Sequence, residues 1–314
     1  MKFEWGLSLL GPRVPMTVAA WPTALNLRAS LELLKPITWF PPMWAYGCGA
    51  LSVARDDFPW LTVAAGVLLA GPLLCGTSQA VNDWFDRHVD AINEPHRPIP
   101  SGRLPGNQGL LIACVWSALS LTVAALLGQT VFLAAALGLA LAWAYSAPPF
   151  RLKANGWLGN AACGFSYETL PWLTGAAVIA RAAWPDYSLS LLTIATLYGL
   201  GAHGIMTLND FKALEGDRRH GVGSLPVRLG PARAARLACL VMALPQLGVI
   251  LQLLYLGLTL PGLMVAGLLG GQLLAMPKLL RDPQRFAPWY NGVGVMLYVL
   301  GMLASALALR TLSS

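Results

Sequence analysis

QAVNDWFDRHVDAINEPHRPIPSGR, residues 79–103, concentrates charge in a chain in which only 11% of the residues are charged. In a helix, Asp83, Asp86 and Asp90 stand at positions i, i+3 and i+7 and share one face. Three carboxylates on one face repel each other unless a cation lies between them. Carboxylate oxygens are hard ligands that suit Mg²⁺, whose coordination shell is often completed by substrate phosphates. The stretch therefore predicts a helix that presents a magnesium site.

The second half of the stretch is rich in proline and predicts where this helix ends. Pro95, Pro98 and Pro100 each lack an amide hydrogen and push the preceding residue away from helical angles. The helix should end before Pro95 and lead into a loop that carries Arg97 and Arg103.

The rest of the chain is apolar, with hydrophobic residues making up 56% of the 314 residues and a mean hydropathy of +0.59. Apolar segments recur along the whole length, each near the ~20 residues that a helix needs to cross a bilayer. This composition excludes the two soluble domains that the length alone would suggest. We predict an all-α polytopic membrane protein with nine transmembrane helices, near residues 37–53, 60–80, 109–127, 131–146, 158–180, 189–208, 234–256, 260–278 and 292–309.

The positive charges predict the orientation of these helices. Of the 21 Lys and Arg residues, only Arg55, Arg181 and Arg310 fall outside the N-terminal arm and the loops after the even-numbered segments. By the positive-inside rule, the arm (residues 1–36) and these loops are cytoplasmic, and residues 37–314 form the membrane domain. The net charge of +7 then reflects contact with anionic lipid head groups of the bilayer, and no nucleic-acid partner is expected.

A second acidic cluster follows the sixth apolar segment, in TLNDFKALEGDRRHGVGSLPVRLG, residues 207–230. Asp210, Glu215 and Asp217 stand there among lysine and arginine, and an Asn-Asp pair begins this cluster as it begins the first. Two acidic loops on one membrane face can hold two Mg²⁺ ions that clamp a diphosphate. The alternative is that both clusters are solvated charge that only sets topology, but their matched starts favour the clamp.

Taken together, these motifs resemble the UbiA-type intramembrane prenyltransferases, and in particular their chlorophyll and bacteriochlorophyll synthase branch. The resemblance is carried by NDWFDRHVDAINEPHRPIPSGR (82–103), NDFKALEGDRRHGVGSLPVRLG (209–230), KPITWFPPMWAYGCG (35–49), AHGIMTLND (202–210) and PWYNG (288–292). One departure concerns the second motif, which is usually written DxxxD in the wider family. Here Ala213 stands four residues before Asp217, so which acids of this motif bind metal stays open.

The resemblance implies a nine-helix bundle with a central cavity and two aspartate-rich cytoplasmic loops, in the inner (photosynthetic, intracytoplasmic) membrane of a bacterium. It implies a Mg²⁺-dependent enzyme that joins geranylgeranyl or phytyl diphosphate to the propionate of a chlorophyllide or bacteriochlorophyllide and releases diphosphate. Two Mg²⁺ ions are expected, with Mn²⁺ as a substitute. Further partners would be proteins of pigment synthesis or assembly.

The resemblance also implies roles for individual residues. The catalytic and metal-binding carboxylates are Asp83, Asp86, Asp90, Asp210 and Asp217, with Asn82 and Glu215 as further residues of the metal site. The diphosphate would be bound by Arg87, Arg97, Arg151, Lys153, Lys212 and Arg218. Topology-setting charge and structural salt bridges are the alternative roles of these cations.

Five residues are candidates for a tetrapyrrole and tail pocket, namely Trp39, Trp44, Tyr145, Glu168 and His203. The tryptophans suit a flat macrocycle, although anchoring at the membrane interface is the simpler role. Glu168 lies within an apolar segment, where a charge costs about 2.5–3.5 kcal/mol, so it should face a cavity or be protonated. His203 either packs with a hydrogen bond or ligates the central magnesium of the tetrapyrrole.

Two other functions are compatible with the sequence. A transporter would place ionisable residues along a path through the middle of its helices, whereas the acids here gather at one membrane face. A prenyltransferase that acts on an aromatic ring, such as a quinone precursor, would form a carbon–carbon bond and would have to remove a ring proton. The branch-like strings favour the esterification.

Overall fold

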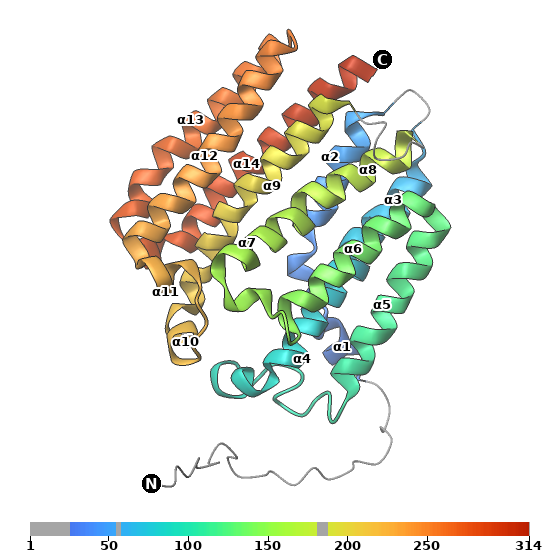
Figure 1. Ribbon diagram of the computed structural model, residues 1–314, viewed down its shortest axis with the longest axis vertical. Coiled ribbons are helices and arrows are strands. Elements are labelled where there is room, and N and C mark those ends of the chain that lie inside the picture. The colour runs from blue at the N-terminus through green and yellow to red at the C-terminus, as the bar shows by residue number, and fades with distance from the viewer. Residues whose placement is uncertain (1–25, 55–57, 181–187, 314) are drawn as a thin grey trace, which may run out of the picture.

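The computed structural model describes residues 26–54, 58–180 and 188–313, and these residues form helices joined by short loops, with no strand (Figure 1). Seven helices are long and apolar enough to cross a membrane. They span Trp60–Asn93, Gln108–Leu127 (α5), Gln129–Ser146 (α6), Leu189–Arg219, Pro231–Tyr255 (α12), Thr259–Arg281 (α13) and Pro283–Leu312. The prediction of an all-α integral membrane protein is confirmed.

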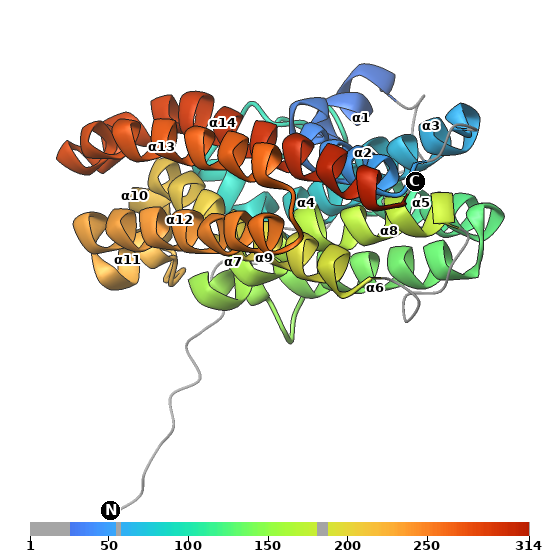
Figure 2. The same cartoon turned by 90° about the horizontal axis from the view of Figure 1, so that it is seen from above.

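Two further helical segments account for the difference from the nine predicted helices. One is α2, Phe40–Ser52, which has only 13 residues. The other consists of α7, Gly156–Gly164, and α8, Leu170–Ala180, which a π-helical turn at Phe165–Thr169 joins into one interrupted helix. A count of nine requires both segments to be included. Figure 2 shows α12 and α13 on one side of the bundle and α3, α5 and α6 on the other.

The helix that carries the first acidic cluster is also interrupted. Trp60–Leu68 (α3) and Gly76–Asn93 (α4) are joined by a π-helical turn, Leu69–Cys75, which contains Pro72. Proline removes one backbone donor from a helix, and a widened turn accommodates that loss. The helix ends at Asn93, two residues before Pro95, as the sequence predicts.

Close contact between α2 and α8 depends on small residues. A Cβ atom on Gly49 would stand 1.9 Å from the backbone oxygen of Trp172, and one on Gly175 would stand 2.1 Å from that of Tyr46. Glycine at both places lets the two backbones touch, which is the usual way in which membrane helices pack tightly. Between α12 and α13, the buried amides of Gln246 and Gln272 exchange two hydrogen bonds of 3.0 and 2.8 Å.

The remaining short helices cluster at one end of the bundle (Figure 1). They are α1 (Leu27–Leu33), α10 (Leu214–Arg219) and α11 (Leu225–Leu229). Leu33 of α1 packs with Ala80 and Val81 of α4, so the last residues of the predicted N-terminal arm are part of the bundle. The long α9 (Leu189–Asn209) reaches the same end, where α14 (Pro283–Ser313) begins.

Candidate active site

The buried acids of α4 are paired with cations from other parts of the chain. Lys35 Nζ lies 2.6 Å from Asp83 Oδ1. Arg97 Nη1 lies 2.8 Å from Asp90 Oδ2 and 3.5 Å from Asp83 Oδ1, so one guanidinium bridges two carboxylates. Burial alone would lower the pKa of Arg97, but the charges of Asp83 and Asp90 outweigh burial, and the pKa is raised.

The third acid of the face, Asp86, has partners from the loop between α6 and α7. Lys153 Nζ lies 2.6 Å from Asp86 Oδ1, and Arg151 Nη2 lies 4.0 Å from the same oxygen. Lys153 is largely buried, and this burial lowers its pKa, while the Asp86 charge acts in the opposite direction. Arg151 has a left-handed backbone, with φ of 37°, at the start of the turn that presents Lys153.

The second acidic cluster begins where α9 ends. Asn160 of α7 donates to Asp210 Oδ2 (3.1 Å) and to Thr207 Oγ1 (3.2 Å). The side-chain oxygen of Asn209 accepts a hydrogen bond of 2.7 Å from Asn291 of α14. The Asn-Asp pair is therefore held between α7 and α14, and Asp210 is directed towards α7.

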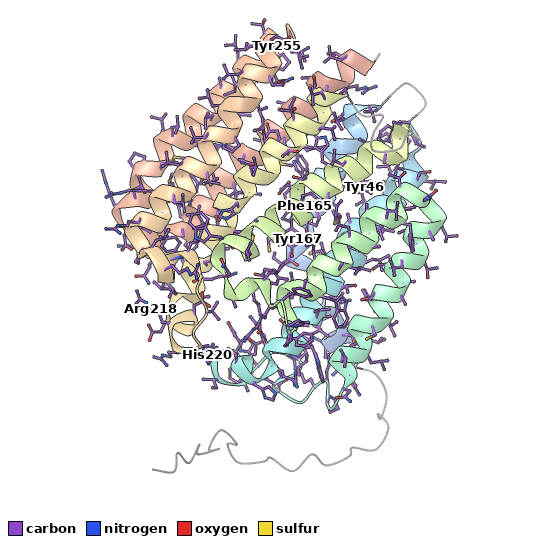
Figure 3. The ribbon with its side chains drawn as sticks, viewed as in Figure 1. Tyr46, Phe165, Tyr167, Arg218, His220 and Tyr255 are labelled. Atoms are coloured by element: carbon purple, nitrogen blue, oxygen red, sulfur yellow. The ribbon has the colours of Figure 1, made fainter. Side chains whose placement is uncertain are left out.

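The two other acids of this cluster point in different directions. Glu215 is exposed and pairs with Arg219 at 3.0 Å, one turn along α10. Asp217 is half-buried, and its neighbour Gly216 lies against the end of α4, where a Cβ atom on Gly216 would stand 3.1 Å from the side chain of Asn93, so the two acidic segments lie side by side. Lys212 and Arg218 are exposed beside them. Figure 3 shows Arg218 at the same end of the bundle as α4.

The donor chemistry of these residues fits a divalent hard cation. The second oxygen of Asp83, Oδ2, is buried and has no hydrogen-bond partner, which is an unfavourable state for an anionic oxygen. Over the described ranges, no three acidic, histidine or cysteine side chains already converge on one point. Lys35 and Lys153 each hold one carboxylate oxygen, and an ion that binds between the acids has to compete with them.

Two predicted residues of the first motif bind groups other than the acids. Asn82 donates a hydrogen bond of 3.3 Å to Ser146 of α6. Arg87 folds back on its own helix, where it donates to the Trp84 carbonyl oxygen (2.7 Å) and lies 4.3 Å from the centre of the Trp84 ring. In this structure Arg87 pairs with none of the acids, unlike Arg97.

The candidate pocket residues have different neighbours. Trp39 and Trp44 use their indole N–H groups to bind backbone oxygens of Leu34 (2.8 Å) and Val299 (3.0 Å). His203 lines an apolar cleft of about 340 Å³ between α7, α9 and α12, and none of the other four candidates lines it.

Glu168 and Tyr145 both face the protein. Glu168 is buried in the π-helical turn that joins α7 to α8, and its Oε2 has no hydrogen-bond partner. Tyr145 of α6 packs beside Gly159 and contacts Cys163 of α7.

Sequence reasoning missed several residues of this site. Lys35 counted there only as a basic residue of the arm, yet a left-handed backbone with φ of 48° delivers it to Asp83. Asn160 and Tyr167 were also missed. The sequence offered one indirect signal for Tyr167, namely the polar residue Gln79 one helical turn before Asp83 on the same helix face. In the structure, Gln79 donates a hydrogen bond of 3.1 Å to Tyr167.

Comparison with known proteins adds independent information. Residues 40–300 match the UbiA prenyltransferase family. The bacteriochlorophyll synthase 33 kDa chain of Cereibacter sphaeroides is 57% identical over 91% of this chain and 94% of its own length. That of Rhodobacter capsulatus is 55% identical over 90% and 93%. The chloroplastic chlorophyll synthase of Avena sativa is 39% identical over 88% of this chain and 75% of its own.

Solved structures show the same fold at lower identity. A UbiA homologue from Archaeoglobus fulgidus bound to DMAPP and Mg²⁺ superposes with a TM-score of 0.69 at 19% identity, and the match covers 90% of this chain and 99% of that one. A digeranylgeranylglyceryl phosphate synthase gives a TM-score of 0.69 at 20% identity, over 91% and 99%.

Proposed function

The chain belongs to the UbiA prenyltransferase family, and we propose that it esterifies the propionate of bacteriochlorophyllide a with geranylgeranyl or phytyl diphosphate, releasing diphosphate. Similarity to bacteriochlorophyll synthases over most of the chain supports this substrate, because the chlorophyll synthases are more distant. The observation that carries the proposal is the pair of adjacent acidic clusters, the first of which binds lysine and arginine through its carboxylates.

We assign the metal site to the inward-facing acids. Asp83, Asp86 and Asp90 on α4 would hold one Mg²⁺ and Asp210 and Asp217 a second, with Mn²⁺ as a substitute. When bound, the metal withdraws negative charge from the diphosphate leaving group. Asn82 would orient a metal-bound water. Because Glu215 is exposed, it is the least suitable metal ligand among the predicted acids.

The cations of the site have two sets of partners in this proposal. Lys35, Arg97 and Lys153 neutralise the carboxylates in the structure described here, and they would turn to the phosphate oxygens when a prenyl diphosphate binds. Arg151, Lys212 and Arg218 lie at the same mouth and would add charge from the rim.

The reaction needs no general base, because the attacking carboxylate is already ionised at neutral pH. One of its oxygens forms a bond to the first carbon of the prenyl chain. The bond from that carbon to the diphosphate oxygen breaks, and diphosphate leaves with the electron pair and one more negative charge. The protein orients the two substrates, stabilises the leaving group and excludes water from the allylic carbon.

The site would lie at the cytoplasmic face of the bacterial inner photosynthetic membrane. The positive charge of the loops at that end of the bundle supports this orientation. In this proposal the chain comprises a cytoplasmic arm (1–36) and a membrane domain (37–314). Within it, the end of the arm supplies α1 and Lys35 to the site.

An in vitro assay tests the proposed function. Purified protein in detergent, with Mg²⁺, geranylgeranyl diphosphate and bacteriochlorophyllide a, should yield the prenyl ester and diphosphate, with a lower rate for chlorophyllide a. Homogentisate serves as the aromatic acceptor. Absence of ester from both pigments, or prenylation of the aromatic ring instead, would contradict the proposal.

A further inference from the structure

A group of polar side chains lies inside the bundle, below the first acidic cluster. Gln79 Nε2 donates to the hydroxyl oxygen of Tyr167 (3.1 Å), and Ser78 Oγ lies 3.5 Å from the same oxygen. Polar groups within a membrane-spanning bundle cost free energy and commonly mark a functional site. The mechanism above uses none of these residues.

These side chains keep part of their surface accessible. Ser78, Gln79 and Tyr167 are only half-buried, although α4 and the turn between α7 and α8 place them within the bundle. Figure 3 shows Tyr167 in the middle of the molecule, between α6 and α7. Tyr145 and Cys163, which contact each other, are also half-buried.

The group lies at the correct depth for a second substrate. Gln79 stands four residues before Asp83, on the same face of α4 and about 6 Å deeper along the helix. A ligand held there would lie one helical turn below the carboxylates that face the diphosphate, on the membrane side.

The hydrogen bonds around Tyr167 leave its hydroxyl proton able to bind a further acceptor. Gln79 donates to the phenolic oxygen, and the Cys75 thiol lies 3.7 Å from it as a second, weaker donor, so that oxygen acts as the acceptor in both contacts. Ser78 donates its own proton to the Cys75 carbonyl oxygen (2.8 Å). Its hydroxyl oxygen, at 3.5 Å, is therefore a distant acceptor for the Tyr167 O–H, and a carboxylate would accept that proton more strongly.

We propose that Tyr167, with Gln79 behind it, binds the carboxylate of the acceptor and positions it for attack on the prenyl chain. This subsite rests on the proposed function. Neutral donors suit it, since they orient an anion without pairing it to a full positive charge that would weaken its attack. The metal and diphosphate site one turn above acts on the other substrate.

The methyl ester of the bacteriochlorophyllide propionate is the decisive probe, because it keeps the macrocycle and removes the anionic oxygen. Pigment binding is followed by fluorescence quenching without metal or prenyl diphosphate. Wild type should prefer the free acid, and Tyr167→Phe should lose that preference and raise the KM for the pigment about tenfold, the usual scale for a hydrogen bond to a charged group. Its KM for geranylgeranyl diphosphate should be unchanged, which also reports that the variant is folded.

Tyr46→Phe is the matched control, because the buried Tyr46 hydroxyl has no hydrogen-bond partner and lies against Gly66 of α3, away from this group (Figure 3). Gln79→Met provides a second test of the same preference if Tyr167→Phe does not fold. Retained preference for the free acid in both variants, with an active wild type, would overturn the subsite alone. A wild type that neither binds nor esterifies the pigment would overturn the proposed function itself.

Discussion

Asp83 is the most deeply buried of the three acids on α4. One of its oxygens accepts from Lys35 and the other is buried without a partner, so the carboxylate is only partly compensated. An incompletely paired buried anion costs free energy, and a cation bound at the open oxygen would remove that cost. The same reasoning separates the acids of the second cluster, where Asp217 faces inward and Glu215 faces solvent.

Asp217→Asn should therefore reduce kcat/KM for the prenyl diphosphate by at least about 10²-fold, the scale found when one transition-state stabilising group is removed. Glu215→Gln, two residues away in the same helix, is the control and should stay close to wild type, because its exposed carboxylate pairs with Arg219. Steady-state kinetics at saturating Mg²⁺ compare the two. Equal losses in both variants would show that the assignment of the inward acid is wrong.

Lys35→Met should affect metal and substrate in opposite directions. Without the ammonium, the α4 acids lose a competitor for metal, so Mn²⁺ should bind more tightly in the absence of substrate, as measured by electron paramagnetic resonance of the free ion. The KM for geranylgeranyl diphosphate should rise roughly tenfold, because one charged contact to phosphate is lost. Lys35→Arg is the control that keeps the charge. A Mn²⁺ affinity in Lys35→Met equal to or below that of wild type would disprove the competition.

The sequence could predict the acids of this site but not their partners. Helical periodicity alone places Asp83, Asp86 and Asp90 on one face, because the period of an α-helix does not depend on the rest of the fold. Lys35 and Lys153 reach these acids from 48 and 67 residues away. Which basic residue pairs with which acid depends on tertiary packing, and neither spacing nor composition carries that information.

Among the elements, the proline-rich loop and α1 form one unit. Arg103 binds both oxygens of Glu32 in α1 (2.6 and 2.7 Å) and the carbonyl oxygen of His96 (2.6 Å). The same loop supplies Arg97 to the acids, and the chain after α1 supplies Lys35. The exposed Glu32–Arg103 ion pair thus connects the two segments that carry Lys35 and Arg97 to Asp83.

Breaking the Glu32–Arg103 pair should make the positions of Lys35 and Arg97 less fixed. The bundle should stay folded, because neither Glu32 nor Arg103 is buried. Glu32→Gln should lower kcat/KM by roughly tenfold, since small misplacements of binding groups are costly. The charge-reversed pair Glu32→Arg with Arg103→Glu should recover most of the activity. Failure of the double variant to improve on either single change would contradict a positioning role.

The pH dependence of this contact has a defined sign. The hydrogen bond from Arg103 lowers the pKa of Glu32. A carboxyl with a lowered pKa stabilises the folded contact above its unfolded pKa, and that stabilisation is lost as the pH falls through the lowered value. When kcat/KM is measured against pH, part of the decrease on the acid side in wild type should come from this lost contact. That decrease should be smaller in Glu32→Gln.

At the scale of the whole molecule, hydropathy predicted the class of fold well because length and apolarity are local properties. It could not show that α2 has only 13 residues or that π-helical turns interrupt two of the helices at 69–75 and 165–169. Those features depend on Pro72 and on packing between helices, such as the close approach of α2 to α8, and mean hydropathy records neither. The second turn carries Tyr167 and Glu168, so what hydropathy could not detect includes part of the interior polar group.

The loops at the two ends of the bundle should lie on opposite sides of the membrane. The acidic clusters and α10 lie at one end, and Tyr255 lies at the other (Figure 3). Cysteines placed at the exposed positions Asn107 and Ala213 should react with a membrane-impermeant maleimide only from the cytoplasmic side, and a cysteine at the exposed Thr259 only from the other. Among the described residues, Cys114 is the one exposed native thiol, and it lies mid-helix in α5, so Cys114→Ala provides the background. Labelling of Asn107→Cys from the outside would reverse the proposed orientation, and would put the diphosphate site on the side of the membrane opposite to the one that the basic loops predict.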